Sequence, residues 1–235
     1  DSCLAAIRCE WGVMKALYYG DNLQVLRESI PNESVDLVYL DPPFNSNATY
    51  NVLFRSPTGE ASEAQIEAFE DTWHWNVQAE IAFDEVIHSG NSEAADLLRA
   101  MRSFLGENDM MAYVAMMAVR LIELRRVLKE TGSLYLHCDP TASHYLKILL
   151  DGIFGAKNFR NEIVWRRSHP KGHAFTRFAS NHDVILCHAK DVTRTTWNPA
   201  YAPHDPETIN EQYNLVDEDG RRYQLTSLLN PNPDR

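Results

Sequence analysis

The sequence predicts an α/β fold, in which a mainly parallel sheet carries helices on its faces. Three observations predict it. Residues 34–40 form a short apolar run that ends abruptly in an acid and two prolines. An apolar stripe at helical spacing begins at Asp109, and a second apolar run followed by a helical pattern occupies residues 133–154. Strands that alternate with helices in this order are typical of a doubly wound sheet.

The apolar run at residues 34–40 leads into Asp41-Pro42-Pro43-Phe44. Each proline lacks a backbone N–H and fixes φ, so the strand must end here. Asp41 precedes a proline and is therefore pushed into an extended conformation. An acid and an aromatic ring are thus held on a stiff loop at the carboxyl end of a strand, which is where open α/β sheets bind ligands.

This loop has the chemistry needed to activate the exocyclic amine of a nucleobase. Such an amine is a poor nucleophile because its lone pair is delocalised into the ring. The Asp41 carboxylate and the Pro42 carbonyl would accept its two N–H groups, as preorganised dipoles at the reacting centre. Phe44 offers a face for base stacking, worth roughly 1–3 kcal/mol. The alternative is a plain strand-to-turn junction, since Asp-Pro-Pro is also good turn chemistry.

The first hundred residues contain shorter signals. Residues 16–19 are a short strand candidate, and Asp21 precedes apolar residues with the spacing of one helical face. Asp21 is a candidate cap for that helix. Residues 45–55 read as a polar loop, which would either fold over a bound base or remain solvated. Residues 56–100 are acidic, with helical spacing around Ile66 and Phe69 and again at 94–99, and Trp73-His74-Trp75 reads as core more than as a stacking platform.

The second half of the chain repeats the strand-then-helix order. The helix that begins at Asp109 is expected to stop at Gly132, and residues 133–137 form a strand. A helix is predicted over 141–154, and residues 162–166 and 183–188 read as two paired strands. Asp139 ends its strand as Asp41 ends an earlier one, so both acids should reach the same sheet edge. Asp139 has a second interpretation as the cap of the following helix.

The charge is distributed unevenly. The net charge is −11, but residues 55–110 hold 12 acids and three arginines, a net of −9. Residues 160–177 carry a net of +4, and basic, aromatic and glycine residues alternate there. We expect this segment to contact phosphates, because such contacts depend on the local charge more than on the net charge of the whole chain. Its basic members are Arg160, Arg166, Arg167, Lys171, His173 and Arg177. His169 and His173 lack further ligands at a suitable spacing, so no metal is expected.

The composition excludes several classes of protein. Hydrophobic residues make up 44% of the chain, which is enough to bury a core. The longest apolar run, residues 110–119, is cut by Arg120 and is too short to span a membrane. The four cysteines form no Cys-x-x-Cys pair, so we expect reduced thiols in a cytoplasmic protein.

The motifs at residues 18–22, 41–44 and 132–139 together resemble those of the S-adenosylmethionine-dependent DNA amino-methyltransferases. The resemblance covers roughly residues 16–190. It is strongest to the modification-methylase subgroup, in which the catalytic motif precedes the cofactor motif. It implies a Rossmann-like methyltransferase sheet with flanking helices, base flipping, and DNA as partner, with a second copy or a restriction subunit as further candidate partners.

The resemblance also implies roles for individual residues. Asp41, Pro42, Pro43 and Phe44 would be catalytic, and S-adenosylmethionine would lie near Tyr19, Asp21 and Asp41. DNA would contact Asp139, Asn45 and the basic segment, in particular Arg166, Arg167, Lys171, His173 and Arg177. Cys138 is not needed as a nucleophile, because amino methylation is a direct transfer. Adenine N6 is favoured over cytosine N4 as the target. The alternatives are methylation of RNA or of a protein glutamine, and a non-catalytic DNA-binding module.

One family motif is missing from this sequence. The family's glycine-rich turn, Phe-x-Gly-x-Gly, is absent, and residues 152–155 have the wrong spacing for it. We therefore expect a fragment with an incomplete sheet that binds cofactor poorly alone. The expected organisation is an N-terminal extension (1–14), a catalytic core (15–190) with an acidic insertion (56–108), and the start of a target-recognition region (191–235).

Overall fold

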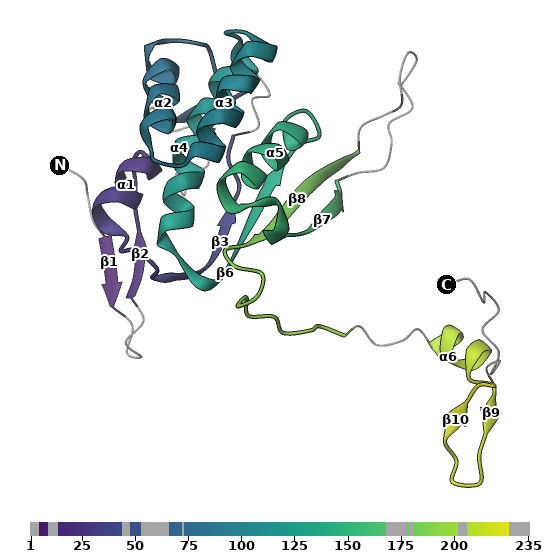
Figure 1. Cartoon of the computed structure of the whole chain (residues 1–235). Coiled ribbons are helices and arrows are strands. Elements are labelled where there is room, and N and C mark those ends of the chain that lie inside the picture. The colour runs from purple at the N-terminus through teal and green to yellow at the C-terminus, as the bar shows by residue number, and fades with distance from the viewer. Residues whose placement is uncertain are drawn as a thin grey trace, which may run out of the picture. The chain divides into compact units, whose positions relative to one another are not determined.

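The computed structural model describes residues 5–8, 14–43, 48–52, 66–71, 73–167, 178, 181–201 and 206–225. The chain divides into two compact units, Asp1–Thr196 and Trp197–Arg235. The first unit holds the central sheet and its helices (Figure 1). The second contains helix α6 (Pro206–Gln212) and an antiparallel pair of two-residue strands, β9 (Leu215–Val216) and β10 (Arg222–Tyr223).

The central sheet has four strands in the order β3-β6-β8-β7. Only β3 (Val35–Leu40) and β6 (Leu128–Cys138) are parallel, and β8 (His182–Ala189) runs antiparallel to both β6 and β7 (Phe159–Arg166). The α/β class is confirmed, but the expected parallel arrangement holds for one pair. The reason is topological. The chain passes from β6 through α5 to β7, and β8 then folds back as a hairpin partner and inserts between them.

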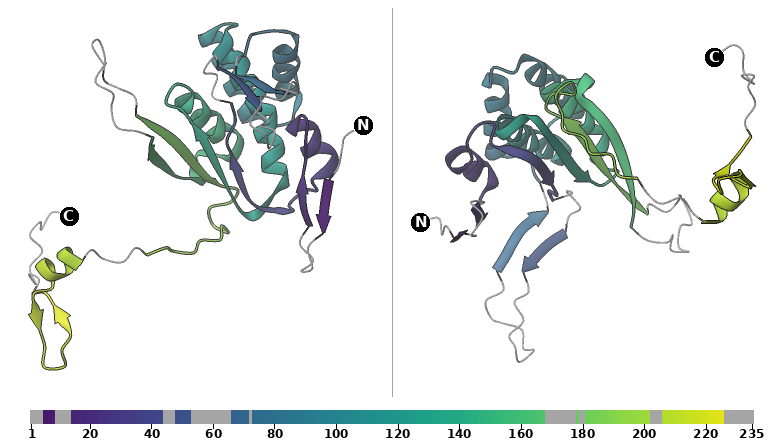
Figure 2. Two further views of the ribbon diagram at one scale, coloured as in Figure 1. Left: turned by 180° about the vertical axis from the view of Figure 1, so that it is seen from behind. Right: turned by 90° about the horizontal axis from the view of Figure 1, so that it is seen from below.

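Helices α4 (Asp109–Val127) and α5 (Ser143–Phe154) pack against one face of the sheet (Figure 2). Successive residues of β6 alternate, and Leu134, Leu136 and Cys138 are fully buried on the helix side. Helices α1 (Asn22–Ser29), α2 (Val77–His88) and α3 (Ser92–Leu105) pack on α4 and α5. The opposite face of the sheet carries exposed Leu37 and Tyr39. None of the helices in the described residues is long and apolar enough to cross a membrane.

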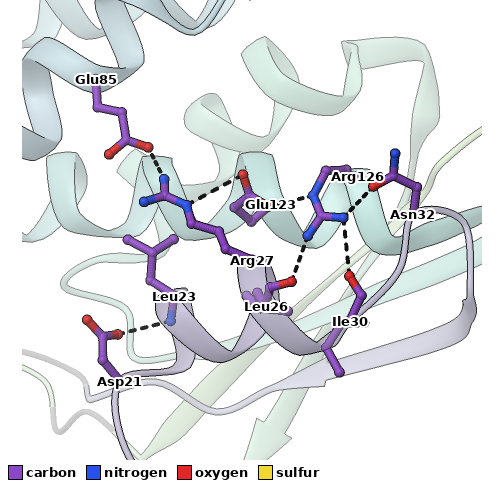
Figure 3. Close-up of polar contacts among 9 residues, drawn as sticks. All are labelled: Asp21, Leu23, Leu26, Arg27, Ile30, Asn32, Glu85, Glu123 and Arg126. Atoms are coloured by element: carbon purple, nitrogen blue, oxygen red, sulfur yellow. Dashed lines mark hydrogen bonds and ion pairs between the residues drawn. The ribbon is translucent and has the colours of Figure 1, made fainter.

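The short helix α1 confirms the helix expected after Asp21, and polar contacts fix it to its neighbours (Figure 3). Arg126 of α4 donates to the carbonyls of Leu26, at 2.7 Å, and Ile30, at 3.2 Å. These carbonyls lie at the carboxyl end of α1, where the helix leaves acceptors unsatisfied. Arg27 forms ion pairs with Glu85 of α2 and Glu123 of α4. The carboxyl end of α1 is therefore anchored against α2 and α4.

Gly132 was expected to end the helix that begins at Asp109, and this boundary is wrong. Helix α4 ends at Val127, and β6 already begins at Leu128, where a fully buried leucine adopts an extended conformation. Gly132 lies inside the strand. A Cβ there would approach the carbonyl oxygens of Lys129 and Asp36 to 3.0 and 3.1 Å. The glycine therefore permits a close approach of backbones rather than a helix stop.

Two further expectations from the first hundred residues need correction. The strand candidate at 16–19 is part of β2 (Met14–Leu17), which pairs with β1 (Ala5–Arg8) outside the central sheet. The helical spacing around Ile66 belongs to a strand, β5 (Ile66–Asp71). Its partner β4 (Ala48–Val52) lies within the expected polar loop. Two apolar residues three apart cannot distinguish a helix from a strand, and here cross-strand pairing decides. The helical pattern at 94–99 is confirmed by α3.

Candidate active site

The strand registers bring several polar residues to one edge of the central sheet. Asp41 follows the last residue of β3, and Asp139 follows the last residue of the parallel strand β6. Because β8 is antiparallel to β6, its beginning at His182 and Asp183 lies at this same edge. Arg166 pairs with His182, so the end of β7 and Arg167 also reach it. The prediction that Asp41 and Asp139 share an edge is therefore consistent with the register.

A cavity of about 330 Å³ opens beside Asp41. Three segments line it: residues 20–22 before α1, residues 40–43 after β3, and the side of α4 that carries Met116, Met117 and Arg120. Trp73 completes the lining. Two sequence motifs that are 20 residues apart thus meet around one space. Tyr19 and Asp139 are not among the described residues that line it.

The Asp41 side chain contacts His137 of β6 and is otherwise largely exposed to solvent. Its side chain is 60% exposed, and its Oδ1 lies 3.1 Å from Nδ1 of His137. The other ring nitrogen of His137, Nε2, lies 3.3 Å from Oδ2 of Asp183. Asp183 has only 4% of its side chain exposed, and its Oδ1 lies 3.2 Å from Nε of Arg167. These four residues form a continuous series of close polar contacts that ends at Asp41.

Asp21 both caps α1 and lines the cavity. Its Oδ1 accepts from the backbone N–H of Leu23 at 2.9 Å and from Nη2 of Arg120 at 2.9 Å. Arg120 also donates to Oδ1 of Asn22 at 2.8 Å and to the Met116 carbonyl at 2.9 Å. Within the described part of the chain, no hydrogen bond engages Oδ2 of Asp21. The two interpretations of Asp21, helix cap and ligand contact, are thus compatible.

Asp139 closes the turn that precedes α5. Its Oδ1 accepts from the backbone N–H groups of Thr141 and Ala142, at 3.1 and 3.2 Å. Its carboxylate is therefore engaged with its own backbone. The N-cap of α5 itself is Ala142, which makes no side-chain cap hydrogen bond, so Asp139 caps the turn and not the helix, and a DNA contact by this residue stays a prediction.

The expected DNA-contacting residues are only partly described. Arg166 is exposed at the end of β7, and Arg167 is held by Asp183. The remaining members of the predicted site, Phe44, Asn45, Lys171, His173 and Arg177, lie outside the described residues, so their placement stays a prediction.

Cys138 lies next to this edge but has no nucleophilic character. The thiol is fully buried at the end of β6, and burial, followed by the nearby carboxylate of Asp139, raises its pKa to about 12. The thiolate is the reactive form of cysteine, so this site offers almost none at neutral pH. Among the described residues, no group of three or more His, Cys, Asp or Glu side chains could hold a metal ion.

The sequence reasoning missed Arg120, His137 and Asp183. Arg120 did leave a signal, because it is the charged residue that interrupts the longest apolar run. His137 and Asp183 are brought together by the pairing of β6 with β8, and no spacing in the sequence shows that contact. Trp73 packs partly against the core, with its ring 6.0 Å from that of Tyr113, and also lines the cavity.

The structure is that of an α/β protein with a cavity beside the carboxyl end of β3. A family described as DNA methylase, the N6/N4 methyltransferases, matches residues 35–231. The chain belongs to this family, and the resemblance seen in its motifs is confirmed.

The chain is also similar to individual proteins. The chain is 28% identical over 173 residues to the Type III restriction-modification enzyme StyLTI Mod subunit of Salmonella typhimurium, covering 73% of this chain and 23% of that protein. It is 34% identical over 120 residues to the Type II methyltransferase M.EcaI of Enterobacter cloacae, covering 51% and 26%. The chain thus spans about a quarter of these relatives. The solved PvuII DNA methyltransferase (cytosine-N4-specific) matches with a TM-score of 0.41 and 13% identity, over 74% of this chain and 49% of that structure.

Proposed function

We propose that this protein transfers a methyl group from S-adenosylmethionine to the exocyclic amine of a flipped DNA base, with adenine N6 as the favoured target. One observation carries the proposal. The Asp41-Pro42 end of β3 and the Asp21 turn line the same cavity, so a site for the base amine adjoins a site for a nucleoside cofactor.

The chain's own residues would activate the amine. The Asp41 carboxylate and the Pro42 carbonyl accept its two N–H groups, which favours a more tetrahedral nitrogen with an available lone pair. S-adenosylmethionine, when bound, would supply an electrophilic methyl group, with its sulfonium sulfur as the leaving group. The nitrogen that accepts this methyl group must lose a proton. The Asp41 carboxylate is placed to hold that proton before it passes to solvent, because its side chain is 60% exposed.

The described residues fit the nucleoside part of this cofactor. The cavity, at about 330 Å³, lies at the small end of the range for ligand sites. Met116, Met117 and Trp73 provide an apolar wall for a base. Oδ2 of Asp21 provides an acceptor for an N–H or O–H donor. Asp21 would therefore hold the cofactor, while Arg120 keeps its carboxylate in place.

DNA is the proposed substrate because of the family and the charge distribution. The segment 160–177 carries a net charge of +4, and its described residues Arg166 and Arg167 lie at the edge that Asp41 also reaches. Phosphate contacts there would position the duplex without reading its sequence. The Salmonella relative is named as the Mod subunit of a restriction-modification enzyme, so a restriction subunit is the proposed protein partner.

The substrate class can be tested without knowing a recognition sequence. The full-length protein is incubated with methyl-labelled S-adenosylmethionine and unmethylated genomic DNA, and the DNA is then digested to nucleosides. We expect the label in N6-methyladenine. Label in N4-methylcytosine would change the proposed target base from adenine to cytosine and would leave DNA as the substrate. Label that enters RNA or protein but never DNA would overturn the proposed substrate.

A further inference from the structure

His137 joins the proposed catalytic acid to a buried one. It projects from β6 with 17% of its side chain exposed, and its two ring nitrogens lie 3.1 Å from Oδ1 of Asp41 and 3.3 Å from Oδ2 of Asp183. Each ring nitrogen thus has one carboxylate oxygen within ion-pair distance, so the ring bridges the two acids.

Asp183 has a close nitrogen neighbour at each of its carboxylate oxygens. It is 4% exposed, and a buried carboxylate is costly unless it is paired. Nε of Arg167 lies 3.2 Å from its Oδ1, and the His137 ring lies 3.3 Å from its Oδ2. Asp183 is fixed by the pairing of β8 with β6 and β7, so it is a rigid anchor for the ring.

We propose that His137 and Asp183 are positioning residues for Asp41. The ring holds Oδ1 of Asp41 and leaves Oδ2 for the amine of the base, while Asp183 fixes the ring from the interior. An exposed aspartate without such support would sample several rotamers. A reacting geometry displaced by about 1 Å can cost about a hundredfold in rate. This inference rests on the proposed function, since it assigns a support to the same carboxylate.

The test uses the full-length protein and the variants His137→Gln and Asp183→Asn. Turnover, KM for S-adenosylmethionine and KM for DNA are measured, and folding is checked by urea denaturation. We expect kcat to fall about 10- to 100-fold, with both KM values within about twofold of wild type. His144→Gln is the matched control, because His144 is exposed on α5, and it should keep the wild-type kcat.

A double-mutant cycle separates positioning from a general structural role. Asp41→Asn removes the charge but keeps one acceptor oxygen, so residual activity is measurable. If His137 acts through Asp41, adding His137→Gln to Asp41→Asn should cost little more than Asp41→Asn alone. If the rate losses of the two single substitutions multiply in the double variant, the inference is refuted. If His137→Gln does not fold, the nearly isosteric Asp183→Asn replaces it in the cycle with Asp41→Asn.

The outcomes distinguish this inference from the proposed function. Wild-type kcat in Asp41→Ala, which lacks any side-chain acceptor, would remove the proposed function and the inference with it. Loss of activity in Asp41→Ala together with wild-type kcat in His137→Gln and Asp183→Asn would leave the proposed function standing and remove only the positioning roles. A change confined to the KM for DNA would also contradict positioning, since it would place these residues in substrate binding.

Discussion

Acidification should destabilise the first unit through His188, a fully buried histidine in β8. Its ring lies between Phe154 and Phe159, at centroid distances of 6.0 and 5.1 Å, and its Nε2 is 3.5 Å from Oδ1 of Asp151. Burial lowers the pKa of His188 from 6.5 to about 4, although the Asp151 carboxylate opposes this shift. The folded protein therefore resists protonation of a side chain that the unfolded chain protonates readily.

The sign of the effect follows from proton binding. Between pH 6.5 and 4 the unfolded chain binds more protons at this position than the folded chain, so stability falls as the pH falls. The contribution is fully present above pH 6.5. It decreases by about 2 kcal/mol at pH 5 and by about 3 kcal/mol below pH 4.

The assay is urea denaturation of wild type and His188→Gln at pH 7.5 and pH 5. The variant loses packing, so its absolute stability is lower at both values. The difference between the two pH values is the informative quantity, and it should be about 2 kcal/mol smaller in the variant than in wild type. His144→Gln should keep the wild-type pH dependence, because this histidine is exposed. A wild-type pH dependence in His188→Gln would refute the linkage to His188.

Two other perturbations test the site and its surroundings. Arg120→Met should destabilise the protein by about 1–3 kcal/mol in urea denaturation, because it removes the donors that join α4 to Asp21 and Asn22, and it should also raise KM for S-adenosylmethionine. An unchanged KM for S-adenosylmethionine would show that the turn with Asp21 and Asn22 does not contribute to cofactor binding. Cys138, with the other three cysteines replaced by alanine, should resist alkylation at pH 8 until urea unfolds the chain, since its thiol is buried with a pKa of about 12. Rapid labelling of the native protein would contradict that burial.

The strand and loop around Asp41 were predictable because several local rules agree there. An apolar run of strand length, two prolines and the position of Asp41 before the first of them all indicate the end of a strand. The run also suggests a buried strand, which is wrong, because β3 lies at the edge of the sheet and its side chains are half-buried or exposed. The helix after Asp21 was predictable for a similar reason, because the spacing of its apolar residues acts within a few positions.

The remaining features depend on contacts between distant segments. The direction of β8 is set by its insertion between β6 and β7, which no local pattern encodes. Gly132 carried a helix-stop signal that the burial of Leu128 overrode. The contact of His137 with Asp183 arises from strand pairing, and the cavity arises from packing of α4 against the loop after β3. Sequence patterns predict elements better than they predict which side chains those elements bring together.

The central claim is that the Asp41 carboxylate activates the amine for methyl transfer. Its most direct test is single-turnover methyl transfer to genomic DNA by the full-length Asp41→Ala variant, with DNA affinity measured in parallel at a stated salt concentration. The account predicts that transfer falls about a hundredfold or more while DNA affinity stays within about twofold of wild type. Transfer at the wild-type rate in this variant would contradict it.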